Sequence, residues 1–311
     1  IEQGRLKLAD PVPLHLSEFA NQQVAVQTPD GVTLRPVQRA ATVQDLLRHT
    51  AGLTYEFLGD SSVQQRYRQE NMGSRGRSNA EFSLARAGLP LMFEPGSVWA
   101  YSRATDVLGR LIEMITGQPL AEHLQQAILT PLGMNDTAFV VPEAGHNRIA
   151  EAFAHDPDGG IPMRLIDPRE TPALHSGGGG LMSTAADYAK FARMILRGGE
   201  LDGKRYLSEA AVRQMTTVQS GDLVTGFTPG NGWGLGWCVV RQPQGEQREI
   251  VPGAFGDHRP RGGARKAVLR QAAKVGELRE TQRNAAADRR PAIEDGLRAQ
   301  VQAVCAPRRC P

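Results

Sequence analysis

Apolar residues recur at helical spacing in two stretches of the chain. Over residues 104–116 they fall three or four positions apart, and Gly117 follows, which predicts a helix with one buried face. A second helix is predicted to begin after Thr184, with Asp187 in capping position. Its apolar stripe consists of Tyr188, Phe191, Ala192, Ile195 and Leu196, before Gly198.

A shorter helix and one strand are predicted from local signals. Thr42 and Asp45 have the spacing of a capping box, and Gly52 offers a stop, so we expect a short helix between them. Between Gly232 and Arg241 apolar residues alternate with glycines. This period of two predicts a single strand whose bare face suits the close approach of another element or a ligand. Its apolar face carries Trp233, Leu235, Trp237 and Val239.

The composition is that of a globular protein with an unusual C-terminal part. Of the 311 residues 40% are apolar, and no run approaches the roughly 18 apolar residues that cross a bilayer, so a membrane-embedded protein is excluded. Residues 246–311 contain 14 basic and 8 acidic residues and, of the chain's aromatic residues, Phe255 alone. We therefore predict a folded domain over 1–245 and a basic, poorly folded tail over 246–311.

The tail shows no sign of binding nucleic acid. Its basic residues are interspersed with acids, and it lacks the aromatic residues that stack on bases. We expect at most a loosely packed helix over about 264–285, and little contribution to stability beyond about residue 257. The cysteines, Cys238, Cys305 and Cys310, form neither a disulfide framework nor a zinc-binding spacing, and they leave the cellular compartment open.

Six segments, taken in chain order, resemble the serine hydrolases of the β-lactamase and penicillin-binding-protein superfamily, and most closely its class C β-lactamase-related esterases. They include Leu-Leu-Arg-His-Thr-Ala-Gly-Leu at 46–53 and Glu-Pro-Gly-Ser-Val-Trp-Ala-Tyr-Ser at 94–102. The others are 2–12, 131–137, 175–184 and 232–237. As an ordered set they are specific, although no single segment would suffice.

The resemblance implies a fold and an activity. The fold is α+β, of the β-lactamase/transpeptidase-like type: an antiparallel sheet flanked by helices, with a mainly helical subdomain over about 40–140. The implied reaction is acyl transfer to water from a small-molecule ester or amide through a serine acyl-enzyme, with no metal and no organic cofactor. An esterase is favoured over a β-lactamase, because the resemblance is to the esterase-like branch.

Tyr101 is the predicted catalytic residue. It aligns with the tyrosine of the family's Tyr-x-Asn motif, which would share a proton with a lysine amine to activate the serine. Ser102 and Arg103 occupy the other two positions of that motif and are candidate substrate-site residues, with arginine standing where the family has asparagine. The alternative for Tyr101 is a half-buried core tyrosine. If it is catalytic, its hydroxyl should face the glycine run at 177–180 and the predicted strand.

The other two motifs of the family are absent or altered. No serine is followed three residues later by lysine, and no Gly-x-Ser-x-Gly occurs. In the family the Ser-x-x-Lys helix leads into a segment like 2–6, so we expect this motif upstream of Ile1 in a truncated chain. The third motif is damaged, with His258, or Arg261 together with Gly262 and Gly263, as its candidates. The sequence after it is typical of an out-of-frame reading of a GC-rich gene.

Two further features have simpler interpretations. The run Gly177, Gly178, Gly179 and Gly180 is no phosphate loop, because no Gly-Lys-Ser/Thr follows. We expect it to allow a tight approach near the active-site strand. His49 is interpreted as a satisfied structural residue. A non-catalytic remnant that binds acyl or peptidoglycan-like ligands is the alternative to an active hydrolase.

Overall fold

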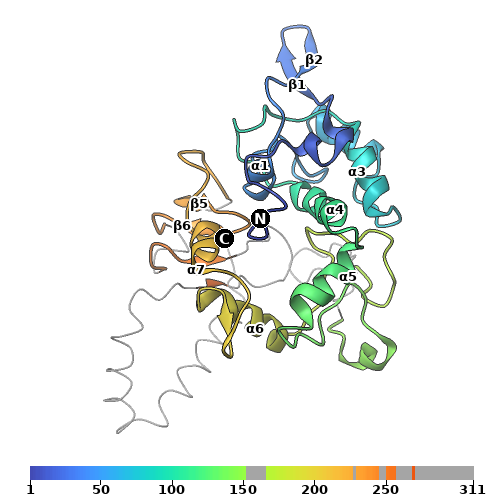
Figure 1. Cartoon of the computed structure of the whole chain (residues 1–311). Coiled ribbons are helices and arrows are strands. Elements are labelled where there is room, and N and C mark those ends of the chain that lie inside the picture. The colour runs from blue at the N-terminus through green and yellow to red at the C-terminus, as the bar shows by residue number, and fades with distance from the viewer. Residues whose placement is uncertain (152–165, 227–228, 245–249, 257–267, 270–311) are drawn as a thin grey trace, which may run out of the picture. The chain divides into compact units, whose positions relative to one another are not determined.

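Side-chain caps mark where five of the seven described α-helices begin. The Thr42 hydroxyl accepts a hydrogen bond from Asp45 N at 3.2 Å and Asp45 accepts one from Thr42 N at 2.9 Å, the predicted reciprocal box. Ser61 and Ser78 begin the next two helices in the same way. In this computed structural model, residues 1–151, 166–226, 229–244, 250–256 and 268–269 are described (Figure 1). The helices there are α1 (Val43–Leu47), α2 (Ser62–Gln69), α3 (Asn79–Ala87), α4 (Ala104–Thr116), α5 (Leu120–Leu124), α6 (Ala185–Leu196) and α7 (Glu209–Thr216), with a π-helical turn (Gln125–Leu129) and 3-10 turns (Val12–Leu14, Ser17–Phe19, Glu143–Arg148).

The two long helices predicted from periodicity are confirmed. Helix α4 ends at Gly117, whose φ of 69° is the left-handed cap that glycine favours. Helix α6 begins at Thr184, whose hydroxyl accepts from Asp187 N. The predicted stripe of α6 is wrong at Leu196, which is exposed, while Met194 is buried in its stead, because the face that packs on the core is centred on residues 191–195 and leaves Leu196 at its edge.

The strands form two small hairpins and one four-stranded antiparallel sheet with the order β5-β6-β7-β8. Together with the helices they make the α+β class that was predicted. Helix α7 contacts the turn between β5 and β6, where Leu235 N donates to Met215 O at 2.9 Å. The strands are β1 (Gln23–Thr28), β2 (Gly31–Pro36), β3 (Glu200–Leu201), β4 (Lys204–Arg205), β5 (Asn231–Trp233), β6 (Cys238–Val240), β7 (Phe255–Gly256) and β8 (Val268–Leu269).

The single strand predicted over 232–241 is wrong. The chain turns back within it, so that β5 and β6 pair with Trp233 opposite Cys238. Gly236 has a φ of 84°, and Gly234 N donates to Trp237 O at 2.7 Å. The glycines that suggested a bare strand face therefore build a tight turn.

Buried apolar residues gather in two main clusters. One joins α1, α3 and α4 around residues such as Leu46, Phe82 and Val107. The other joins α6 and α7 to the sheet and includes Trp237 and Phe255. The sheet thus continues past residue 245. Composition placed the start of the tail there, because a single aromatic residue, Phe255, hardly changes the average composition of residues 246–311.

The described residues belong to one compact unit, which spans 1–270. The helix predicted over about 264–285 is wrong at Val268–Leu269, which is strand β8 and pairs with β7; the rest of that range lies outside the described residues. Among the residues that the structure describes, no helix has the length and apolar character that a bilayer crossing requires.

Candidate functional site

Tyr101 lies in a group of ring side chains that comes from three separate segments. Its ring centroid is 4.7 Å from that of His49, 5.5 Å from that of Tyr55 and 6.2 Å from that of Trp233. Trp99 completes the group, 5.0 Å from Trp233. We call these five residues the aromatic cluster. Tyr101 is half-buried in it, between the loop that follows α1 and strand β5.

His49 contacts three other members of the aromatic cluster, Trp99, Tyr101 and Trp233. Its side chain is 4% exposed and its backbone is left-handed, with a φ of 58°. Nδ1 lies 3.3 Å from the hydroxyl oxygen of Ser102, which is itself buried. Burial lowers the pKa of His49 to about 3, so the imidazole is neutral at pH 7. This neutral ring lies directly against Tyr101.

Arg103, predicted to meet substrate, is held by internal carboxylates. Its guanidinium donates to Glu56 at 2.5 and 3.3 Å and to Asp106 at 3.3 Å, and it stacks over the Tyr55 ring at 4.8 Å. Burial opposes the charge, but the hydrogen bonds to Glu56 and the nearby Asp106 outweigh it and raise the pKa of Arg103. The charge that replaces the family's asparagine is therefore balanced within the fold.

Asp106 connects α4 to the glycine run. Its buried carboxylate accepts from the Ser176 hydroxyl at 2.5 Å and from Gly178 N at 3.1 Å. A Cβ at Gly177 would lie 2.3 Å from Thr105 O, so only glycine fits against the helix there. The run does allow a close approach, as expected, but the partner is helix α4 and not a strand. A Cβ at Gly178 would lie 3.1 Å from the Tyr55 hydroxyl, next to the aromatic cluster.

Three of the predicted residues cannot be placed relative to Tyr101. His258, Gly262 and Gly263 lie outside the described residues, and the third motif stays a prediction. Within the described part of the chain, no group of three or more His, Cys, Asp or Glu side chains is arranged to hold a metal ion.

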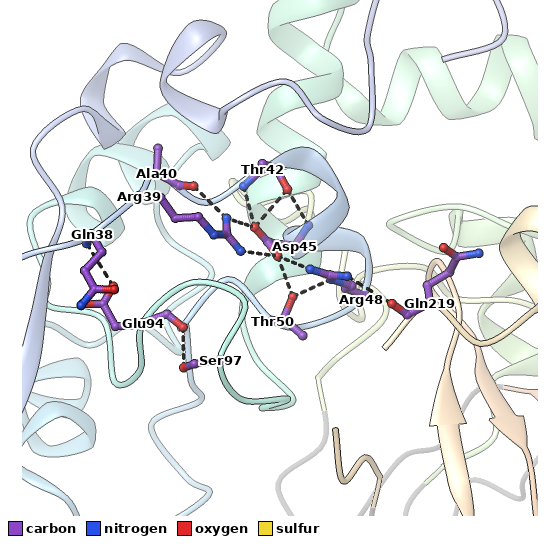
Figure 2. Close-up of polar contacts among 10 residues, drawn as sticks. All are labelled: Gln38, Arg39, Ala40, Thr42, Asp45, Arg48, Thr50, Glu94, Ser97 and Gln219. Atoms are coloured by element: carbon purple, nitrogen blue, oxygen red, sulfur yellow. Dashed lines mark hydrogen bonds and ion pairs between the residues drawn. The ribbon is translucent and has the colours of Figure 1, made fainter. Parts of the chain in front are cut away.

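Several polar residues next to the site were not singled out for it from the sequence. Figure 2 shows Asp45, interpreted above only as a helix cap, at the centre of a set of hydrogen bonds that includes Arg39, Arg48 and Thr50. Glu56 and Asp106 likewise gain their roles from residues distant in sequence. The sequence signal for these hydrogen bonds is the pair of arginines, Arg39 and Arg48, on either side of Asp45.

Comparison with known proteins assigns the class. The sequence matches the Beta-lactamase family over residues 1–276, and the chain belongs to this family. Protein Rv1367c of Mycobacterium tuberculosis is 34% identical over 268 residues, which are 82% of this chain and 66% of that protein. Esterase EstB of Burkholderia gladioli is 33% identical over 261 residues, 76% of this chain and 61% of the esterase. The chain thus spans slightly less than two thirds of the length of these relatives.

Solved structures agree with the fold. EstCE1, described as a hydrolase with promiscuous acyltransferase activity, is 26% identical with a TM-score of 0.63, covering 82% of this chain and 68% of its own. Simvastatin synthase (LovD) from Aspergillus terreus is 23% identical with a TM-score of 0.64, covering 82% and 67%. The predicted superfamily and its α+β fold are confirmed.

Proposed function

We propose that this chain carries the Tyr101 side of a serine hydrolase site that transfers the acyl group of a small-molecule ester to water. The observation that carries the proposal is the place of Tyr101, half-buried against neutral His49 and between the loop after α1 and strand β5. Relatives named as an esterase and as a hydrolase with acyltransferase activity support the reaction class.

In this proposal Tyr101 takes part in removing the proton of the serine hydroxyl. A serine hydroxyl is a weak nucleophile until a neighbouring base accepts its proton, and a tyrosine with a lysine can share that task. The serine oxygen then bonds to the ester carbonyl carbon, the alcohol leaves with a proton, and water releases the acid from the acyl-enzyme. Neutral His49 and the Tyr55 ring both pack against the Tyr101 ring.

No Ser-x-x-Lys pair, which would supply the nucleophile for this reaction, occurs in the 311 residues. The lysines are Lys7, Lys190, Lys204, Lys266 and Lys274, and none has a serine three residues before it. We therefore propose that the chain alone does not turn over esters. Binding of acyl or peptidoglycan-like ligands without chemistry is the second candidate, and the same missing pair favours it.

Covalent labelling tests the absence of a nucleophile. The purified chain is incubated with a labelled fluorophosphonate, with a labelled penicillin and with a chromogenic short-chain ester. We expect no stoichiometric label and no hydrolysis above buffer. Stoichiometric labelling of any serine would show that the chain contains a nucleophile of its own.

The role of Tyr101 is tested in a fusion that supplies a Ser-x-x-Lys segment before Ile1 and an intact third motif after β7. Tyr101→Phe should lower turnover by about 10²-fold or more while the fold is retained, because general-base help is typically worth 10² to 10⁴. Tyr188→Phe is the matched control, since Tyr188 is half-buried on α6 beside Phe191. An unchanged rate in Tyr101→Phe would reduce Tyr101 to a packing residue.

A further inference from the structure

Asp45 is a carboxylate with no exposed surface and an unusually full set of donors. Arg39 donates to it at 2.6 and 3.2 Å, Arg48 at 2.8 Å and the Thr50 hydroxyl at 2.8 Å. Thr42 adds its backbone N–H at 2.9 Å and its hydroxyl at 3.0 Å. We call these five residues the Asp45 network (Figure 2). A helix cap needs only the Thr42 contacts, so the cap does not account for the others.

The charges in the network keep Asp45 ionised. Burial alone would raise the pKa of Asp45, but hydrogen bonds from Arg39, Thr42, Arg48 and Thr50 outweigh burial and lower it well below its usual range. Hydrogen bonds to a charged acceptor are about twice as strong as neutral ones. The carboxylate therefore holds its donors, and the segments that carry them, in one arrangement.

One of these segments is the turn at 48–50, which contacts the Tyr101 loop. Thr50 is bound twice, by its hydroxyl to the Asp45 carboxylate and by its N–H to Asp45 O at 2.8 Å. The carbonyls of this turn hold the Tyr101 loop in place, because Thr50 O accepts from Gly96 N at 2.7 Å and His49 O from Ala100 N at 2.9 Å. The orientation of the turn is transmitted to the residue just before Tyr101.

The Asp45 network is also connected by hydrogen bonds to the hairpin of β5 and β6. Arg48 donates to Gln219 O at 3.1 Å, and the amides of Gln219 and Ser220 donate to Trp233 O at 2.7 and 3.0 Å. Leu47 O also accepts from Gly236 N at 2.8 Å. Hydrogen bonds thus connect the Asp45 carboxylate to the segments on both sides of the aromatic cluster, the Tyr101 loop and the hairpin that contains Trp233.

We propose that Asp45 is the positioning residue for Tyr101, acting through the turn at 48–50 and through Arg48. It touches neither Tyr101 nor any reacting atom in this scheme; it sets the orientation of the Tyr101 ring against His49 and Trp233. Its relevance to catalysis rests on the proposed function of Tyr101, whereas the positioning itself does not.

Fluorine NMR of the full chain tests the positioning directly. The five tyrosines are replaced biosynthetically with 3-fluorotyrosine, and Tyr101→Phe identifies the Tyr101 resonance. In Asp45→Asn and Thr50→Val we expect this resonance to move by more than its linewidth. Thr50→Ser, which keeps the hydroxyl, should return it to the wild-type position. Thr50→Val alone carries the test if Asp45→Asn does not fold.

The chain offers a matched pair of controls in the cap of α6. Asp187 is buried and accepts from the Thr137 hydroxyl at 3.0 Å and from Lys190 at 2.9 Å. Asp187→Asn and Thr137→Val should leave the Tyr101 resonance in place. An unmoved resonance in Thr50→Val, or equal shifts in the controls, would overturn the proposal. The NMR experiment measures no turnover. If Tyr101→Phe left the turnover of the fusion unchanged, the proposed function would be refuted, but the NMR result would still support the positioning role of Asp45.

Discussion

Replacing His49 by asparagine should remove a specific pH dependence of stability. The pKa of His49 is about 3 in the folded chain, against 6.5 for an unperturbed histidine. As the pH falls below 6.5, the unfolded chain binds a proton at this position and the folded chain does not. Folding stability is therefore lost as pH falls from 6.5 to about 3, by about 1.4 kcal/mol per pH unit. At pH 4.5, two units below 6.5, the loss is about 3 kcal/mol.

Asparagine is the suitable replacement because the backbone there has a φ of 58°, which Asn tolerates better than most residues. It does not titrate, so the loss of about 3 kcal/mol should vanish, whatever the substitution costs at neutral pH. Asp45 does not obscure the comparison. The pKa of Asp45 is lowered on folding, so its stabilisation is lost mainly below pH 3.8 and equally in both proteins.

Urea unfolding at pH 7.5 and pH 4.5, followed by tryptophan fluorescence, measures the effect. The quantity compared is the difference in free energy of unfolding between the two pH values. The same substitution at His146, a half-buried histidine outside the aromatic cluster, is the control and should keep the wild-type difference because His49 is retained. If His49→Asn shows the same pH difference as the wild type, burial does not hold this imidazole neutral.

Two further substitutions test the surroundings of the site, each by urea unfolding at pH 7.5. Arg103→Met should destabilise the fold by about 3 to 5 kcal/mol because it leaves Glu56 and Asp106 unpaired; adding Glu56→Gln should restore part of the loss, and strict additivity would contradict the pairing. Gly177→Ala should cost about 1 to 3 kcal/mol because its Cβ would meet Thr105 O, whereas Gly76→Ala, with its nearest neighbour at 3.5 Å, should stay within about 0.5 kcal/mol.

The elements that were predicted well are those whose signals are local. Helices α1, α4 and α6 each begin or end at a residue whose side chain or φ is decided by its near neighbours, Thr42, Gly117 and Thr184. The strand failed for a related reason. A period of two is shared by a strand and by a hairpin with a short turn, and only the left-handed Gly236 separates them. The sequence alone does not show that Gly236 adopts this φ.

The sequence singles out Tyr101, whose catalytic role stays a prediction, and few of the side chains around it. Tyr101 was singled out through the ordered motifs around it. Glu56, which pairs with Arg103, and Ser176, which binds Asp106, lie 47 and 70 residues from these partners along the chain. Such pairs follow from tertiary packing, to which local propensity and spacing are blind. The same holds for Arg48, whose contact with Gln219 spans 171 residues.

The ion pair between Glu56 and Arg103 restricts the order in which these two residues can have arisen during evolution. An arginine gained at 103 without an acid at 56 would be a partly desolvated cation that lacks its strongest partner, and the acid gained first would lack the cation. Contacting residues of this kind have strongly non-additive effects. The two positions should therefore change together among relatives, asparagine at 103 occurring with an uncharged residue at 56. A lineage that has made both exchanges is hindered from reverting either one alone.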